Sequence, residues 1–343
     1  MRICSTLAVV WLCQALPTRG QQTSVFFRVV SPTNTVITAF GGGTVFWSNA
    51  ITEGVTCTVQ RALAVPGPSN WTDYVHHAVT NVAMELLLYD PNPPAGMVLI
   101  PGGVNVGTDP DFGAYSLTVD AFYMDRYEVT KALWDEVYAW AVTNGYSFDN
   151  AGSGKAPEHP VQTVNWYDCV KWCNARSEIE GKVPVYYIDA AFAVVYRAGP
   201  EYSESILTPF VNGTADGYRL PTDSQWQYAA RGGQLGRRYP WGDGIDHEKA
   251  NYQGETRYTE GGYPYTSPTG AFSAGDNVYG LSDMTGNVIE WCDGWYIEGR
   301  LRMLHGGGWA FPPDFCRIAG RFATAPDYAS DVTGFRTVLL SGR

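Results

Sequence analysis

The sequence has few charged residues, and positive ones are the scarcer kind. Charged residues make up 17% of the 343 positions, and 23 Lys and Arg stand against 34 Asp and Glu, so the formal net charge is −11. An acidic surface repels the phosphates of nucleic acids and of anionic lipids. The composition therefore argues against nucleic-acid binding, and the low charged fraction argues against a coiled coil.

Long apolar runs are also missing after the first twenty residues. No later segment has eighteen predominantly apolar residues in a row, so we expect no membrane span in the mature chain. Glycine (38), proline (21), tyrosine (22) and tryptophan (12) are plentiful instead. This balance is typical of a loop-rich globular chain in which aromatic side chains hold irregular segments together or line binding grooves.

The first twenty residues predict an export signal. A basic start, Met1-Arg2, precedes a mostly apolar stretch over residues 3–16 and a polar, turn-prone segment that ends near Gly20. About fourteen apolar residues match the apolar region of a signal peptide and are too few to cross a bilayer. We therefore expect an exported protein that is periplasmic, cell-surface or extracellular. The alternative is that this segment forms an N-terminal strand or a buried helix.

Cysteine is scarce once the predicted signal is removed. Five cysteines remain, namely Cys57, Cys169, Cys173, Cys292 and Cys316. Because five is odd, at least one thiol is free or pairs with another chain. Cys169 and Cys173 lie four residues apart in a predicted helix, but no second Cys or His pair completes a zinc site. We interpret them as two small buried residues.

The chain divides into two regions that differ in the secondary structure that their residue patterns predict. Residues 23–90 contain short β-type runs separated by turn signals and predict a small all-β module without a catalytic constellation. Residues 91–96 form a proline-rich linker, and residues 97–341 form the second unit. Capping residues in that unit predict helices near Thr130–Val142, Asn165–Ser177 and Thr222–Arg231. We expect the two units to have separate cores.

Eight short motifs follow one another from residue 97 to about residue 340. They are MVLIPGG (97–103), VDAFYMDRYEVT (119–130), HPVQTVNWYDCVKWCN (159–174), YRLPTDSQWQYAARGG (218–233), YPWGD (239–243), YGLSDMTGNVIEW (279–291), GGGW (306–309) and GFR (334–336). In this order they resemble the formylglycine-generating enzyme (sulfatase-modifying factor) family. The resemblance implies an α+β, C-type-lectin-like fold with little regular secondary structure. The β module lies outside it.

The resemblance also implies a copper chemistry that these residues do not readily supply. In the family's oxidases, two cysteines shortly after a Gly-Gly-Ser-aromatic turn bind copper(I), and oxygen then converts a substrate cysteine into formylglycine. Soft Cu(I) needs both thiolates for such a site. Here Cys316 is the one cysteine of the stretch, Phe311 stands where the first thiol is expected, and Gly308 replaces the serine. Cys316 remains the candidate catalytic residue, and a buried or disulfide-bonded cysteine is the alternative.

A calcium site is the second implication of the resemblance. The side chains of Asp283 and Glu290 and the carbonyls of Gly286 and Val288 match the ligands of a family calcium site. Hard Ca²⁺ prefers such a mixture of carboxylate and carbonyl oxygens in an irregular loop. The alternative is a turn that carries two solvated carboxylates.

A second family calcium site is weakened in this sequence. It would use the side chain of Asn251 and the carbonyls of Tyr252 and Tyr263, together with an aspartate two residues before Tyr263. That position is Gly261, with Glu260 beside it, so one carboxylate ligand is missing.

Two hypotheses about function remain open. In the first, the chain is a calcium-stabilised, lectin-like binding module with an unknown protein or glycan ligand, and Trp309 and Phe311 fill the vacated copper pocket. In the second, it is a formylglycine-generating oxidoreductase that acts on a sulfatase-type Cys-x-Pro-x-Arg peptide. The residues around Cys316 favour the first hypothesis. The second requires another thiol to approach Cys316.

Overall fold

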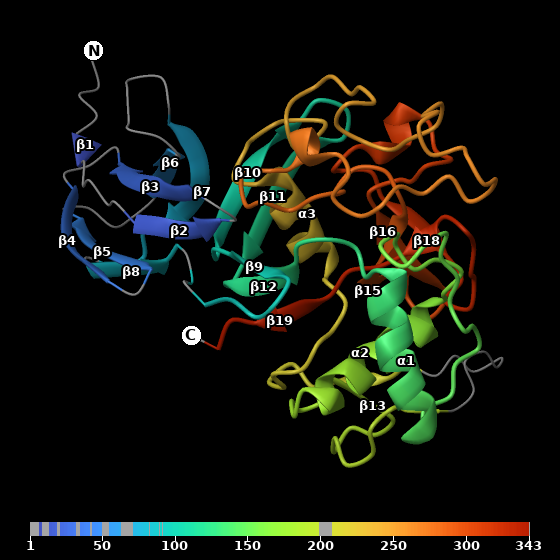
Figure 1. The fold of residues 1–343 in the computed structure, drawn as a ribbon. Coiled ribbons are helices and arrows are strands. Elements are labelled where there is room, and N and C mark those ends of the chain that lie inside the picture. Colours follow the sequence, from blue (N-terminus) through green and yellow to red (C-terminus); the bar gives the residue numbers. More distant parts are fainter. Residues whose placement is uncertain are drawn as a thin grey trace.

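The computed structural model describes residues 7–8, 14–18, 21–31, 35–41, 43–49, 55–62, 71–81, 83–88, 90, 92–198 and 208–342. These residues form an α+β fold with three α-helices among many short strands, which confirms the expected fold class (Figure 1). The early strands gather at one end of the molecule, and the helices and long loops make up the rest (Figure 1).

The first eight strands form most of two sheets. Their bounds are β1 Leu7–Ala8, β2 Gln14–Thr18, β3 Gln21–Val30, β4 Thr35–Gly41, β5 Thr44–Asn49, β6 Thr56–Ala62, β7 Thr72–Ala78 and β8 Ala83–Leu87. One sheet has the order β4-β5-β8, and in the other β3 pairs with β1, β2 and β6. Strands β1 and β2 lie inside the predicted signal peptide and correspond to the strand alternative for that segment. Export itself stays a prediction.

The larger sheet continues past the predicted linker, so the expectation of two separate cores is wrong. Strand β7 is followed in the sheet by β10 (Gly103–Asp109) and β11 (Gly113–Val119), with Val104 opposite His76. One cluster of buried side chains also runs from Phe27 and Val59 in the early strands to Ile318 and beyond. Residues 23–90 and the second unit therefore share a sheet and a hydrophobic core.

Glycine at position 103 permits this junction. A Cβ on Gly103 would collide with the carbonyl oxygen of His76 and would lie 2.7 Å from Cγ2 of Val75. The bare backbone is what lets β10 approach β7 closely enough to pair. Long-range bonds add to the junction, because Tyr279 donates its hydroxyl proton to the Tyr74 carbonyl (2.7 Å) and Arg61 donates to the Val278 carbonyl (2.6 Å).

The three helices lie where the capping residues predicted them. They are α1 (Lys131–Thr143), α2 (Trp166–Ile179) and α3 (Asp223–Arg231). Thr130, Asn165 and Thr222 each accept a hydrogen bond from the backbone of the first turn, and the last two form full capping boxes with Asp168 and Gln225. These bonds satisfy backbone donors that a helix N-terminus leaves unpaired.

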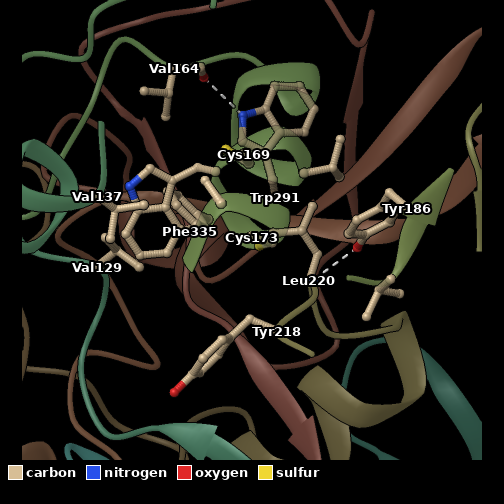
Figure 2. Close-up of a cluster of buried hydrophobic side chains, with 14 of the residues drawn as sticks. Val129, Val137, Val164, Cys169, Cys173, Tyr186, Tyr218, Leu220, Trp291 and Phe335 are labelled. Atoms are coloured by element: carbon tan, nitrogen blue, oxygen red, sulfur yellow. Dashed lines mark hydrogen bonds between the residues drawn. The ribbon is translucent and has the colours of Figure 1, made fainter. Parts of the chain in front are cut away.

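Helix α2 lies at the centre of a second buried cluster, part of which is drawn in Figure 2. Its side chains are buried on nearly all sides, including both Cys169 and Cys173, which confirms that they are packing residues. Trp172 stacks on Trp134 of α1 with ring centroids 5.9 Å apart. Phe335 meets both rings edge-on, so the end of the chain closes this cluster.

The remaining strands are short and frame the loops. They are β9 Met97–Ile100, β12 Phe122–Asp125, β13 Tyr186–Tyr187, β14 Phe210–Val211, β15 Ile289–Ile297, β16 Leu301–His305, β17 Phe322–Thr324, β18 Thr333–Gly334 and β19 Val338–Leu340, with 3-10 turns η1 (Ser273–Gly275) and η2 (Pro313–Cys316). They form the sheets β19-β12-β9, β13-β14 and β17-β16-β15-β18. Among the described residues, no helix combines the length and apolar character needed to cross a bilayer.

Candidate functional site

The segment after β16 carries the residues compared with a copper site. Strands β15 and β16 form an antiparallel hairpin, and the chain then turns at Gly306 and returns through η2 to β17. The amide of Trp309 donates to the Asn287 carbonyl (2.8 Å), which fixes this segment against the Asp283–Glu290 turn. The copper-type and calcium-type positions are therefore neighbours.

Cys316 is buried under the turn that begins this segment. Its Sγ lies 3.8 Å from the Pro312 carbonyl oxygen, and a Cβ on Gly307 would lie 2.9 Å from the Cys316 Cα. Burial in a cluster with Tyr239 and Tyr252 raises the pKa of the Cys316 thiol to about 12. A thiol with such a pKa is protonated at neutral pH, whereas Cu(I) binding and nucleophilic chemistry use the thiolate.

The other four described cysteines lie on three elements, none of which carries Cys316. Cys57 is in β6, Cys169 and Cys173 are in α2, and Cys292 is in β15. All five are free and buried in the described structure. Burial also raises the pKa of the Cys292 thiol well above its ordinary value, with a further contribution from the carboxylate of Glu290.

Aromatic side chains surround the position expected for the first thiol. Phe311, Phe315 and Phe322 contact one another with ring centroids 5.2–6.0 Å apart. Phe311 and Phe322 also line a pocket of about 350 Å³, which Tyr328 borders. Because Phe315 is 43% exposed and Tyr328 is 47% exposed, this group opens to solvent. We call these four residues the aromatic pocket.

A second aromatic group surrounds Trp309. Tyr263 stacks on Tyr265 with centroids 4.3 Å apart, and both contact the Trp309 ring at 5.3–5.5 Å. Tyr263 is 72% exposed, and the Trp309 indole donates to the Asp331 carbonyl (3.1 Å). Trp309 is therefore covered by tyrosines, while Phe311 belongs to the aromatic pocket.

The turn expected to bind calcium is held in a rare backbone conformation. Asp283 and Asn287 have positive φ angles of 56° and 61° without being glycine. The Gly270 amide donates to the Asp283 carboxylate (2.6 Å), and Asn287 is bound on several sides, including by the Ser267 amide (2.9 Å). Such conformations persist only where surrounding bonds enforce them. Asp283 is buried, so this turn does not carry two solvated carboxylates.

Glu290 faces a buried cation. The Arg336 guanidinium donates to both of its oxygens at 2.7–3.0 Å, and the Trp226 indole adds a bond of 2.7 Å. Arg336 also donates to the Ser282 carbonyl (3.0 Å) and is fully buried. The guanidinium thus joins the GFR motif to the calcium-type turn.

A third carboxylate, Glu128, belongs to this cluster and was missed in the sequence. It follows β12 within the motif VDAFYMDRYEVT and accepts hydrogen bonds from the Val288 amide (3.0 Å) and the Asn287 side chain (2.6 Å). Burial, followed by the carboxylates of Asp283 and Glu290, raises the pKa of Glu128 well above its usual range. Burial likewise raises the pKa of Asp283 to about 6. In the sequence, the position of Glu128 within the motif VDAFYMDRYEVT was the only signal that could have identified it.

The charge of this cluster fits a divalent cation. Glu128, Asp283 and Glu290 supply three formal negative charges against the single positive charge of Arg336. A buried excess of negative charge is costly and is relieved by protons or by a cation. Among the described residues, the three carboxylates do not form a group that could bind a metal ion as they stand, because Glu290 is paired with Arg336. With the Gly286 and Val288 carbonyls, the donor chemistry still suits calcium.

The weakened second calcium position retains one unsatisfied oxygen. Asn251 is buried and donates to the Tyr265 carbonyl (2.9 Å), while its Oδ1 has no hydrogen-bond partner among the described residues. The Tyr252 ring stacks on His247 at 3.9 Å, and Tyr263 is largely exposed. Asn251 therefore offers a buried, unsatisfied side-chain oxygen to a cation at this position.

Comparisons with known proteins place this site in a family. The sequence profile of the sulfatase-modifying factor enzyme 1-like domain matches residues 85–340. A chaperone protein LppX of Paenibacillus barcinonensis is 34% identical over 245 residues, which cover 66% of this chain and 83% of LppX. The formylglycine-generating enzyme of Bos taurus is 29% identical over 72% of this chain and 75% of the enzyme. The inactive C-alpha-formylglycine-generating enzyme 2 of Bos taurus is 38% identical over 37% of this chain and 46% of that protein.

Solved structures agree with this assignment. The crystal structure of CarF superposes with a TM-score of 0.58 at 28% identity and covers 72% of this chain and 98% of CarF. Variable protein 1 of Treponema denticola shares the fold, with a TM-score of 0.55 at 22% identity over 75% of this chain and 96% of its own. The profile begins at residue 85, inside β8, which agrees with the shared core across the predicted linker. The chain belongs to the sulfatase-modifying factor enzyme 1-like domain family.

Proposed function

We propose that this chain is a non-catalytic binding member of its family, and that the aromatic pocket takes an apolar side chain of a protein ligand. The observation that carries the proposal is the state of Cys316. Its thiol is buried and protonated, and phenylalanine occupies the position of the expected partner thiol. A two-thiolate copper centre has no support from this arrangement.

The surroundings of the aromatic pocket favour a ligand with basic residues. Asp327 and Asp331 are next to the lining residues Tyr328 and Val332. The nearby Arg321 is bound by Asp223 at 3.0 Å, and Arg317 is bound by Asp314 at 2.6 Å. Acids therefore outnumber cations among the sequence neighbours of the lining residues, and aromatic anchors beside such charge suit a partner with an apolar side chain flanked by Lys or Arg.

The names of two relatives agree with this proposal. One similar protein is called a chaperone and another an inactive formylglycine-generating enzyme 2, so the family includes members without an oxidase name. The formylglycine-generating enzymes among the relatives supply the alternative, which is oxidation of a cysteine in a Cys-x-Pro-x-Arg peptide.

We further propose that calcium stabilises the fold and that the chain is exported. The ion would be held by the side chains of Asp283 and Glu290 and by the carbonyls of Gly286 and Val288. The carboxylate of Glu128 would not bind the ion but would add negative charge beside it. The ion would stabilise the fold by balancing the negative charge of the buried carboxylates, and it would take no part in a reaction. Export rests on the apolar segment at residues 3–16.

One experiment separates the binding and oxidase functions. The purified chain is incubated with a Cys-x-Pro-x-Arg peptide, Cu(I), oxygen and a reductant, and the peptide mass is measured, with the Bos taurus enzyme as the positive control. We expect no conversion and no tight stoichiometric Cu(I) binding. Conversion by the parent that is lost in Cys316→Ser would establish the oxidase instead.

A second experiment tests the ligand class. A random-peptide library is selected on the parent chain and counter-selected on Tyr328→Asp, an exposed position that leaves the core intact. Enrichment of peptides with an apolar residue beside Lys or Arg is the expected result. Peptides that bind the parent and the variant equally would place the ligand elsewhere.

A further inference from the structure

A lysine holds the loop that carries the weakened second calcium position. Lys155 lies between α1 and α2, and its Nζ donates to the carbonyl oxygens of Tyr258 (2.5 Å) and Gly262 (3.3 Å). The same nitrogen lies 5.8 Å from the centre of the Tyr265 ring, within reach of a cation–π contact. We call residues 258–265 the lysine-bound loop. Both described hydrogen bonds of the ammonium therefore end on backbone carbonyls of one loop.

Two further contacts show that the segment of Lys155 runs beside this part of the chain. A side-chain hydrogen bond of 3.0 Å joins His159 Nδ1 to the Thr266 hydroxyl, and the Thr269 amide donates to the Glu158 carbonyl (2.9 Å). His159 is buried, so the first of these contacts lies inside the molecule. Packing of the two segments therefore places the ammonium at the lysine-bound loop.

The loop lacks the carboxylate that a second calcium ion would need. The position expected to carry it is Gly261, and among the described residues a Cβ built there would meet only Cε of Lys155 within 4 Å, at 3.8 Å. The amide oxygen of Asn251 is neutral and cannot replace the missing charge. A calcium ion at this loop would also meet the ammonium, which is a like charge. The residues present therefore do not fit a second calcium ion.

We infer that the ammonium of Lys155 replaces the second calcium ion in this chain and holds the lysine-bound loop in its stead. An ammonium carries one positive charge and three N–H donors, so it can bind several carbonyl oxygens as a hard cation does. One of its acceptors, the Gly262 carbonyl, directly precedes Tyr263, whose own carbonyl is the one expected to face the ion. Because the lysine is part of the chain, the loop should keep its conformation when calcium is removed.

The lysine also fixes the backbone that presents an exposed aromatic ring. Tyr263 is 72% exposed and stacks on Tyr265 with ring centroids 4.3 Å apart, and both rings contact Trp309. The position of this aromatic group should therefore not depend on calcium. The inference does not rest on the proposed function, because neither the aromatic pocket nor the proposed ion at Asp283 uses this lysine.

Hydrogen exchange of the full chain in a calcium chelator tests the role of the lysine. The Gly262 amide donates to the Thr259 carbonyl (3.2 Å), so peptides that cover the lysine-bound loop report its order. We expect Lys155→Met, which keeps the apolar stem but not the charge, to exchange there about three- to tenfold faster than the parent. Lys182→Met, at a partly exposed lysine after α2, is the matched control and should exchange like the parent. Equal exchange of the parent and of folded Lys155→Met would overturn the inference.

Calcium binding by a double variant tests whether the lysine takes the place of an ion. Lys155→Met with Gly261→Asp removes the ammonium and supplies the missing carboxylate, and aspartate adopts a left-handed φ, here 83°, more readily than most residues. Equilibrium dialysis should find one more bound calcium ion in this variant than in the parent, whatever number the parent binds. Gly261→Asp alone should bind no more calcium than the parent, because Lys155 neutralises the new carboxylate. Equal numbers in the parent and in the folded double variant would overturn the replacement.

Discussion

At the scale of single residues, charges are balanced at two places in the second unit, one buried and one partly exposed. Arg336 meets Glu290, Glu128 and Asp283 in the calcium-type cluster. Asp223, in the first turn of α3, meets His305 Nε2 at 2.7 Å and Arg321 at 3.0–3.1 Å. His305 is itself buried and stacks on Trp226 with centroids 4.8 Å apart. Removing Arg336 would leave buried carboxylates without a cation, whereas removing Asp223 would leave the more exposed Arg321 without its partner.

Asp223→Asn should destabilise the chain by about 1–3 kcal/mol at pH 7, because it removes a negative charge that faces Arg321 and lies at a helix N-terminus. Burial alone would raise the pKa of Asp223, but the bonds from His305 and Arg321 outweigh it and hold the pKa well below its usual value. A depressed carboxyl pKa stabilises the fold above the unfolded value near 3.9, and this contribution is lost as the pH falls further.

Denaturant unfolding of the parent and of Asp223→Asn at pH 7 and pH 3 measures this effect. The difference between the two proteins should be smaller at pH 3. Glu298→Gln, at an exposed acid, is the control and should match the parent. A difference that does not shrink on acidification would contradict the charge argument.

Calcium should raise the melting temperature of the parent, because an ion that binds only the folded state stabilises it by mass action. Asp283→Asn should abolish the rise, since it removes one of the charges that hold the ion. Asp327→Asn removes an exposed acid and should leave the rise unchanged. Identical melting curves of the parent in calcium and in chelator would show that Arg336 and protons alone balance the cluster.

At the scale of secondary-structure elements, the junction of β7 and β10 depends on a residue without a side chain. Gly103→Ala would press a methyl group against the His76 carbonyl and Val75, and backbone cannot move aside easily. We expect a loss of about 1–3 kcal/mol, the usual cost of overpacking.

Gly213→Ala is the matched control for this substitution, because a Cβ there meets nothing within 4 Å and no left-handed φ is involved. Thermal unfolding of both variants measures the difference. Equal stability of Gly103→Ala and Gly213→Ala would mean that the two strands can separate without cost.

The helices were predictable and the strand junction was not, for a physical reason. Helix ends are set by neighbours three residues apart, so Thr222 and Gln225 can be read directly from the sequence. Pairing of Val104 with His76 joins residues 28 positions apart across a proline-rich segment, and no local pattern encodes it. Gly103 closes the motif MVLIPGG, but its role as a close approach became visible only with the strands in place.

The candidate site could likewise be predicted only in part from the sequence. Motif positions drew attention to the turn at Asp283 and to the thiol of Cys316, both of which are buried in the structure. Glu128 was missed because its partners, Val288 and Asn287, lie about 160 residues further along the chain. Burial of all three carboxylates follows from packing that the sequence does not display.

At the scale of the whole molecule, the shared core makes the early strands part of the folding unit. Phe27 and Val59 pack in the same cluster as Trp226 and Ile318, and the Tyr279 hydroxyl is bonded to Tyr74. We therefore expect a single thermal transition in calorimetry, with equal calorimetric and van't Hoff enthalpies. Two resolved transitions, or early loss of exchange protection confined to β3, β6 and β7, would show that the units unfold separately.

The position of Arg336 and β19 also bears on how the chain folds during synthesis. Strand β19 pairs with β12, which was made about 215 residues earlier, and Arg336 reaches the carboxylates of Glu290 and the backbone of Asp125 and Arg126. Until these last residues leave the ribosome, the sheet lacks its edge strand and a buried cluster of acids lacks its cation. The family domain can thus be completed only after translation has passed residue 340, and a prematurely terminated chain exposes its unfinished core to chaperones and proteases.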